Sequence, residues 1–195
     1  KDCMKLNNDY QLMTWNEEQA NEFMSKNYPN FYTYFINYPK KIQKVDSFRY
    51  FLLYHFGGIY LDMDIECKKP FVEYNFENTV NLVEDNSDVY LNPIKLNNFI
   101  MVSPRGHPFW LHVIQYLISN YEKKWWQTDF WYVLYSTGPG MLTQAYDSYV
   151  NKESIKILSS KQFNPCNPCE CTSSDNSFIK HTYAAEWTST SDGLL

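Results

Sequence analysis

The sequence predicts a single α/β domain in which helices pack against a mainly parallel central sheet. Short apolar runs, typical of buried strands, alternate along the chain with longer segments of helical periodicity. The chain has 195 residues, of which 44% are hydrophobic, enough to build the core of one domain. Because no internal repeat or long linker divides the sequence, we expect residues 1–195 to form one domain.

The first elements are predicted from turn residues and helix caps. Residues 10–15 form a short apolar strand candidate. Asn16 is expected to cap a helix that starts with two glutamates and ends before Pro29. The segment 29–39, which is bounded by prolines, is expected to be irregular or a short helix.

Residues 40–56 predict an amphipathic helix. Its expected apolar face contains Ile42, Val45, Leu52, Leu53 and Phe56. Gly57 and Gly58 should end this helix, because glycine accepts the left-handed conformation of a C-terminal cap. Residues 59–64 should follow as a strand.

The remaining elements continue the alternation. Strands are predicted at 79–84, 97–103 and 154–159. Pro108 suits the first turn of a helix that runs to about residue 121. A further helix is predicted near 129–135, and a turn at 136–143 leads into a helix that ends near residue 149.

Composition and charge limit the classes of partner. The formal net charge is −5 and no long run of lysines or arginines occurs, so neither a nucleic-acid-binding surface nor a surface for anionic membranes is expected. No membrane segment is expected in this chain, because no apolar stretch approaches the roughly 20 residues of a transmembrane helix. The chain begins abruptly at Lys1, so an upstream anchor is compatible with the sequence and the localisation stays open.

Five cysteines leave the redox compartment undecided. Cys166, Cys169 and Cys171 form a tight cluster that supplies three of the roughly four ligands of a zinc site. A surface loop with free thiols or one disulfide is the preferred interpretation. A structural metal site with a fourth ligand and a disulfide-rich secretory context are the alternatives.

Two aspartates, Asp62 and Asp64, end the predicted strand 59–64. Side chains alternate along a strand, so Tyr60 and both carboxylates should share one face, with the carboxylates about 7 Å apart along the strand. Open α/β sheets bind ligands at this end of their strands. Mg²⁺ or Mn²⁺, held together with substrate phosphates, would relieve the repulsion between the carboxylates. A solvated strand end is the alternative.

The preceding helix contributes a second charged pair. Asp46 and Arg49 are three residues apart, so they are neighbours on one helix face, and helical phase places them on the apolar face. Charges on a buried face are usually paired or functional. A purely structural ion pair is the alternative interpretation.

Together these features resemble the sugar-binding DXD region of family 32 glycosyltransferases, which include the yeast initiating α-1,6-mannosyltransferase. The family pattern is Asp-x-x-Arg-Tyr, an apolar stretch, Gly-Gly-x-Tyr and Asp-x-Asp, and residues 46–64 match it completely. The matching positions are Asp46, Arg49, Tyr50, Gly57, Gly58, Tyr60, Asp62 and Asp64. Looser echoes of the family occur at 97–109, 136–143 and 181–187.

The resemblance implies a GT-A fold and an enzyme, a hexosyltransferase. It would move a hexose from a UDP- or GDP-linked donor to a glycan or protein-linked acceptor, with retention of the anomeric configuration. It implies that Asp46 and Arg49 hold the donor sugar. It also implies that Asp62 and Asp64 bind Mn²⁺ or Mg²⁺ together with the donor.

The resemblance further implies that Tyr60, His181 and Trp187 contact the donor nucleotide. Glu186 stands where the family usually has Ser or Gly, and the family's first strand is not found, so the base pocket is expected to be truncated or built differently. Core packing is the preferred interpretation of Trp125 and Trp126, and stacking on sugar is the alternative. Carboxylates considered for the acceptor side, each also interpretable as a solvated charge, are Glu84, Asp85 and Asp129.

Other classes of function remain as alternatives. A catalytically degenerate domain that binds nucleotide sugars or glycans would keep the same residues without turnover. A phosphohydrolase using Asp-x-Asp as nucleophile and acid is disfavoured, because Ile65 and Glu66 follow the second aspartate. A structural or interaction domain would need none of these side chains.

Overall fold

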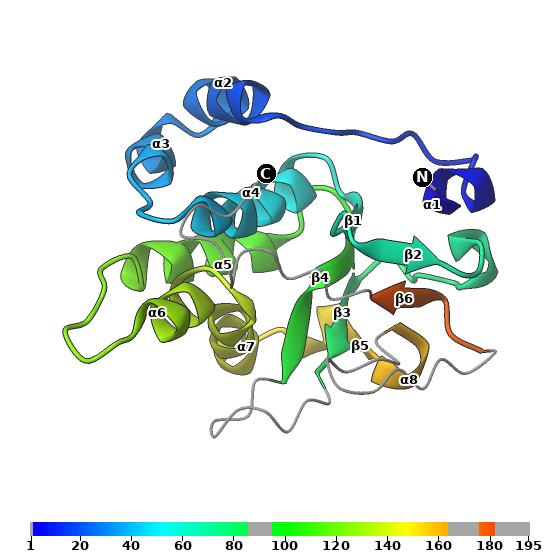
Figure 1. Cartoon of the computed structure of the whole chain (residues 1–195). Helices are drawn as coiled ribbons and strands as arrows, with labels where there is room; N and C mark the ends of the chain where they lie inside the picture. The colour runs from blue at the N-terminus through cyan, green and yellow to red at the C-terminus, as the bar shows by residue number, and fades with distance from the viewer. Residues whose placement is uncertain (1, 86–94, 164–175, 182–195) are drawn as a thin grey trace.

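A four-stranded mixed sheet lies at the centre of the computed structural model, which describes residues 2–85, 95–163 and 176–181 (Figure 1). Its strand order is β1–β4–β3–β5, with β1 Gly58–Leu61, β4 Leu96–Ser103, β3 Val80–Glu84 and β5 Ile155–Leu158. β4 runs antiparallel to both of its neighbours, whereas β3 and β5 are parallel.

The predicted α/β class is confirmed, but the sheet is mixed instead of mainly parallel. Parallel neighbours need a crossover of about a dozen residues or more, usually containing a helix. β3 and β4 are joined by residues 85–95 alone, and the chain returns antiparallel. β3 and β5 are separated by three helices and form the parallel pair.

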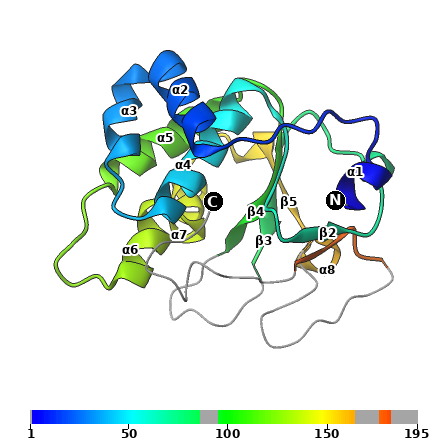
Figure 2. The same cartoon turned by 45° about the horizontal axis from the view of Figure 1, so that its top comes forward.

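Helices cover one face of the sheet (Figures 1 and 2). This layer consists of α4 Lys41–His55, α5 Pro108–Ser119, α6 Asp129–Ser136 and α7 Pro139–Ser148, with α2 Glu17–Asn27 and α3 Pro29–Ile36 packed outside α4. None of the described helices is both long enough and apolar enough to cross a bilayer.

The other face carries a smaller layer. It consists of α1 Asp2–Leu6, α8 Ser160–Phe163, the 3₁₀ turn η1 Phe71–Glu73 and a two-stranded sheet of β2 Ile65–Cys67 with β6 Ile179–His181. A second 3₁₀ turn, η2 Lys152–Ser154, leads into β5. Alternate strand residues divide between the two layers, since Leu82 and Met101 pack with the helices while Val83 and Ile100 pack with the smaller layer.

Helix α4 is enclosed on most of its surface. Phe48 and Phe51 pack against Phe23 of α2 and Phe31 of α3, with ring centroids 5.8 Å and 4.7 Å apart respectively. The predicted single apolar face was therefore too narrow, and Phe56 from that face is exposed. Its charged residues Asp46 and Arg49 are buried as well, and they contact Asn98 of β4 and Thr137 after α6.

The start of α2 follows its sequence signal, whereas the segment before it does not. Asn16 accepts a hydrogen bond from the backbone of Gln19 at 2.8 Å and caps the helix as predicted. Residues 10–15 form no strand, and most of them are exposed. Trp15 instead packs edge-on against Phe23 and Phe48. The apolar character of this segment therefore reflects, at Trp15, an aromatic contact and not a strand.

Gly57 and Gly58 make the turn from α4 into β1, with φ of 71° and 88°. A Cβ atom on Gly57 would lie 2.6 Å from the backbone nitrogen of Arg105, whereas a Cβ on Gly58 would meet nothing within 4 Å. Both positions need the left-handed conformation that glycine adopts readily. At Gly57 the neighbouring backbone also leaves no space for a Cβ atom.

This pair provides a matched test of the turn. Gly58→Ala should cost about 1–2 kcal/mol of unfolding free energy, because an L side chain is strained at positive φ. Gly57→Ala should cost at least about twice as much, because the backbone at Arg105 must also move. Urea unfolding of both variants measures the difference, and equal losses would show that the close approach at Gly57 has no energetic weight.

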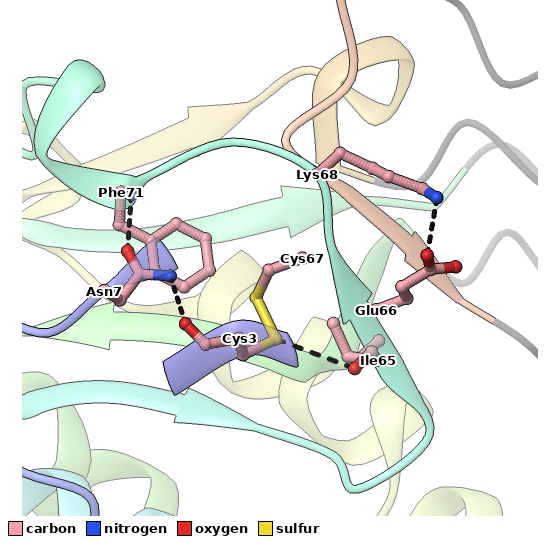
Figure 3. The surroundings of a disulfide bond; sticks show 7 residues. All are labelled: Cys3, Asn7, Ile65, Glu66, Cys67, Lys68 and Phe71. Carbon is pink, nitrogen blue, oxygen red and sulfur yellow. Dashed lines mark hydrogen bonds and ion pairs between the residues drawn. A yellow bond between two sulfur atoms is a disulfide. The ribbon is translucent and has the colours of Figure 1, made fainter. Parts of the chain in front are cut away.

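A disulfide between Cys3 and Cys67 ties α1 to the end of β2 (Figure 3). The contact is reinforced by Asn7, whose side chain donates to the carbonyl of Cys3 at 2.8 Å and accepts from the backbone of Phe71 at 2.7 Å. The sequence did not predict this pairing, because the two cysteines are 64 residues apart and belong to no spacing motif. The cluster at Cys166, Cys169 and Cys171 lies outside the described residues.

Removing the disulfide should destabilise the protein substantially. For a closed loop of this length, the loss of chain entropy in the unfolded state is worth about 4 kcal/mol. The Cys3→Ser/Cys67→Ser double variant should therefore unfold at a clearly lower urea concentration than the oxidised wild type. A thiol reductant should lower the wild-type midpoint and leave the double variant unchanged, which controls for the other cysteines.

Candidate functional site

The guanidinium of Arg49 lies at the centre of a buried polar network. Only 2% of Arg49 is exposed. Its Nη2 is 2.8 Å from Oδ1 of Asp46 and its Nη1 is 3.2 Å from Oδ1 of Asp62. Nη1 also donates to the backbone carbonyl of Asn98 at 2.7 Å. Arg49 therefore joins α4 to the end of β1 and to β4.

Asp46 is held from three directions inside the protein. Besides Arg49, it accepts hydrogen bonds from the side chain of Asn98 at 3.1 Å and from the hydroxyl of Thr137 at 3.2 Å. Only 5% of Asp46 is exposed, and this burial raises its pKa to about 6, while Arg49 acts in the opposite direction. The carboxylate is therefore fixed in position, in surroundings that favour its protonated form more than water does.

Sequence reasoning did not single out Asn98 and Thr137. Asn98 lies in an irregular part of β4, because the β3–β4 register jumps from Leu82↔Met101 to Val83↔Asn97. Residues 98–100 consequently have no partner on β3, and the carbonyl of Asn98 is turned to Arg49 instead. Both residues fall in segments that echo the family, 97–109 and 136–143, and this was the available signal.

Tyr60 orients Asp62. Its hydroxyl donates to Oδ1 of Asp62 at 2.7 Å, and the Arg49 guanidinium lies 4.8 Å from the centre of its ring. Burial raises the pKa of Tyr60 well above its usual value, so the phenol stays a donor. The Asp62 side chain is 27% exposed, so part of it is accessible to a ligand or to solvent.

The two motif aspartates lie in a turn, which corrects the predicted strand 59–64. β1 ends at Leu61, although the backbone of Asp62 still donates to the carbonyl of Phe99 at 2.9 Å. The backbone of Ile65 then donates to the carbonyl of Asp62 at 3.3 Å and begins β2. The spacing expected for a strand does not apply here, because residues 62–65 form a turn.

His181 reaches the same turn from the far end of the chain. It faces Ile65 in the antiparallel β2–β6 pair, and its Nε2 lies 3.1 Å from Oδ2 of Asp64. Its ring stacks on Phe99 with centroids 4.5 Å apart. The structure thus brings His181 to Asp64, while Trp187 lies outside the described residues.

The carboxylates considered for the acceptor side have structural partners. Glu84 accepts from both the backbone and the hydroxyl of Ser160, at 2.9 Å and 3.0 Å. Asp129 is exposed and pairs with Lys40 and Lys123. The backbone of Asp85 continues the strand contact by donating to the carbonyl of Lys95 at 2.8 Å. The side-chain contacts of Glu84 and Asp129 favour the interpretation of these two carboxylates as structural or solvated charges.

Trp125 and Trp126 are exposed, so the prediction of core packing was wrong for this pair. They lie in the connection between α5 and α6, ahead of the helix start at Asp129. Tryptophan side chains are buried in the core on average. Trp125 and Trp126 are not, because their loop extends away from the packed layers.

The acidic turn fits a divalent cation that a ligand helps to hold. Two carboxylates, those of Asp46 and Asp62, contact one guanidinium, and the carboxylate of Asp64 follows two residues after Asp62 in the turn. Among the residues the structure describes, no group of three or more potential metal ligands gathers. Two carboxylates completed by phosphate oxygens are the donor set that Mg²⁺ and Mn²⁺ accept.

Comparison with known proteins identifies this arrangement. Residues 1–90 match the family model described as the glycosyltransferase sugar-binding region containing the DXD motif. This segment belongs to that family. The sugar-binding region contains Asp46, Arg49 and both aspartates of the turn, so the family predicted from the sequence is confirmed.

Two curated relatives extend the similarity of the sugar-binding region to the rest of the chain. Inositol phosphoceramide mannosyltransferase 3 of Schizosaccharomyces pombe is 34% identical over 76% of this chain and 39% of its own length. Inositol phosphoceramide mannosyltransferase 1 of the same yeast is 31% identical over 92% of this chain and 52% of its own length. The chain therefore spans about half, or less, of these relatives.

A solved structure shows the same fold over most of this chain. PaToxG Glycosyltransferase superposes with a TM-score of 0.50 at 20% identity, covering 77% of this chain and 62% of its own. The GT-A fold expected from the sequence is thereby confirmed.

The buried position of Asp46 predicts an unusual pH dependence of stability. Because its pKa is raised from 3.8 to about 6, the folded state binds more protons than the unfolded state between these values. Stability from this group is therefore present at pH 4 and lost as the pH rises through 6. The unfolding free energy of wild type minus that of Asp46→Asn should fall by up to about 3 kcal/mol over this range. A difference that stays constant in urea titrations from pH 4 to pH 7 would contradict this.

Proposed function

We propose that the protein is a metal-dependent glycosyltransferase that transfers a hexose from a nucleoside-diphosphate sugar. The observation that carries the proposal is the Arg49 network, in which one buried guanidinium joins the helix pair to the DXD turn. A purely structural ion pair needs no second carboxylate at the protein surface. Here Asp62 is partly exposed at the turn, so the network ends where a ligand can reach it.

The side chains of this network have distinct tasks in the proposal. Arg49 and Asp46 hold hydroxyl groups of the donor sugar, a role supported by the Nε atom of Arg49, which is buried without a hydrogen-bond partner within the described residues. Tyr60 keeps Asp62 in a single orientation through its hydroxyl. Because these groups are fixed before the donor binds, they cost little reorganisation during the reaction.

Asp64 and Asp62 are the residues that we assign to a bound Mn²⁺ or Mg²⁺. Such an ion stabilises the negative charge that develops on a departing nucleoside diphosphate. Asp64 offers a carboxylate at the turn, and His181 fixes one of its oxygens. We assign Asp64 as the principal ligand and Asp62 as the residue that also contacts the ribose or sugar. Retention of the anomeric configuration is part of the proposal, because it follows from the family resemblance.

The relatives suggest which donor and acceptor to test first. Both curated proteins described above are named as mannosyltransferases of inositol phosphoceramide. We therefore propose mannose as the first donor sugar, with GDP and UDP as carriers, and an inositol-phosphate-bearing lipid as the first acceptor. A glycan or protein-linked acceptor is the alternative.

The disulfide bears on where this reaction takes place. Disulfides persist in oxidising compartments and are rare in the cytosol. The Cys3–Cys67 bond is close to the DXD turn in sequence, because β2 begins directly after Asp64 and ends at Cys67. We propose an oxidising compartment as the site of action.

Ligand-induced stabilisation tests the proposed donor site. A nucleotide hexose at a hundredfold excess over its Kd should raise the unfolding free energy by about 2.7 kcal/mol with Mn²⁺, and much less with EDTA. Asp64→Ala should abolish the metal-dependent response to the bare nucleoside diphosphate. Asp62→Ala should keep part of it and lose discrimination between donor sugars. Each shift is measured against the same variant without ligand.

Controls separate the possible outcomes. Asp147→Ala removes an exposed aspartate that pairs with Lys95, and it should respond like wild type. If no nucleotide sugar stabilises the folded protein, both transfer and donor binding are excluded. Donor stabilisation without hydrolysis or transfer of the sugar would identify a binding domain instead of an enzyme.

A further inference from the structure

Two adjacent tryptophans are the most exposed aromatic side chains described in the protein. Trp125 is 92% exposed and Trp126 is 61% exposed. They lie in the connection between α5 and α6, residues 120–128, which projects from the helical side in both views (Figures 1 and 2). A buried Trp removes about 150–250 Å² from water, so leaving two exposed indicates a contact made elsewhere.

Lys123 and Lys124 precede this pair in a segment that also contains Glu122 and Asp129. The ammonium group of Lys124 lies 5.4 Å from the ring centre of Trp126, and Lys123 binds Asp129 at 2.6 Å. Phe130, at the start of α6, is also exposed and extends the aromatic surface. Tryptophan with neighbouring lysine is typical of segments at a membrane interface, where the indole lies among headgroups and the ammonium contacts their phosphates.

We propose that residues 122–130 form a membrane-contact loop for a bilayer with anionic headgroups. In this contact Trp125 and Trp126 insert at headgroup depth. Lys124 contacts lipid phosphates from beside Trp126. The membrane contact is independent of the proposed activity, whereas its use in presenting a lipid acceptor rests on that activity.

The geometry of the rings favours a bilayer over a bound glycan. The rings of Trp125 and Trp126 meet edge to face, with centroids 5.6 Å apart and planes at 87°, so they form no common platform. Lys124 lies over the ring of Trp126. A sugar-stacking residue needs a ring locked by packing, and Trp125 is almost fully solvated. Insertion into an interface makes no such demand, since hydrophobic burial is non-directional.

The loop also lies within reach of the candidate site. Helix α6 has 8 residues and so a length of about 12 Å. The loop precedes it, and Thr137, directly after it, donates to Asp46. A bilayer contacted by the loop is thus about one short helix away from the Arg49 network, a distance that a lipid headgroup with an attached inositol phosphate can bridge.

Vesicle flotation of the complete chain tests the membrane contact. The probes are phosphatidylcholine vesicles with and without phosphatidylinositol. Wild type should float with the anionic vesicles, and Trp125→Ala/Trp126→Ala should partition at least about tenfold more weakly. Lys124→Glu should weaken binding by about fivefold or more, and only on anionic vesicles. Val150→Ala, at a 98% exposed apolar position elsewhere, should bind like wild type.

The remaining outcomes overturn the proposal. These are no flotation of wild type, equal flotation of the double variant, a variant defect only in binding soluble oligosaccharides, or loss of a dimer in sedimentation without any vesicle binding. Stabilisation by nucleoside diphosphate and Mn²⁺ should be unchanged in the double variant. Failure of the proposed function would abolish that stabilisation and leave flotation intact, so the two failures are distinguishable.

Discussion

A single buried cation, the guanidinium of Arg49, is the group on which the candidate site depends. Removing a charge of this kind from water is costly, and the cost is met only because two carboxylates and a backbone carbonyl contact it. Removing one partner of a buried pair typically costs about 3–5 kcal/mol, because the other charge is then stranded. Stability is therefore coupled to the geometry of the candidate site at Arg49.

The DXD turn is clamped between the two layers of the fold. On the helical side, Arg49 and Tyr60 hold Asp62. On the opposite side, His181 contacts Asp64 from the small sheet, and the Cys3–Cys67 disulfide fixes the strand that leaves the turn. A turn between two short strands would otherwise be a mobile place for two like charges. Contacts from both layers give the DXD turn a defined conformation.

Local sequence patterns predicted the parts of this structure that local physics determines. Helical periodicity located α4, apolar runs located β3 and β4, and the spacing of Asp46 and Arg49 placed both charges in the interior. Strand direction was wrong because it depends on the short connection 85–95, and the strand at 10–15 was wrong because a strand needs a partner. Contacts between distant segments carry no local signal, as with Thr137 at Asp46 and the pairing of Cys3 with Cys67. The exposure of Trp125 was not predicted. The preference of tryptophan for the core is an average over many positions, and it does not describe a single residue in a protruding loop.

The supports of Asp46 have a consequence for how members of such a family can diverge. The region that defines the family ends at residue 90, whereas Asn98 and Thr137, which donate to Asp46, lie beyond it. Replacing either donor would alter the proton affinity of Asp46 and leave every recognisable motif position unchanged. Two proteins with identical motifs can therefore hold the same carboxylate in different charge states at a given pH. The chemistry of the motif is set partly by residues that the motif does not contain.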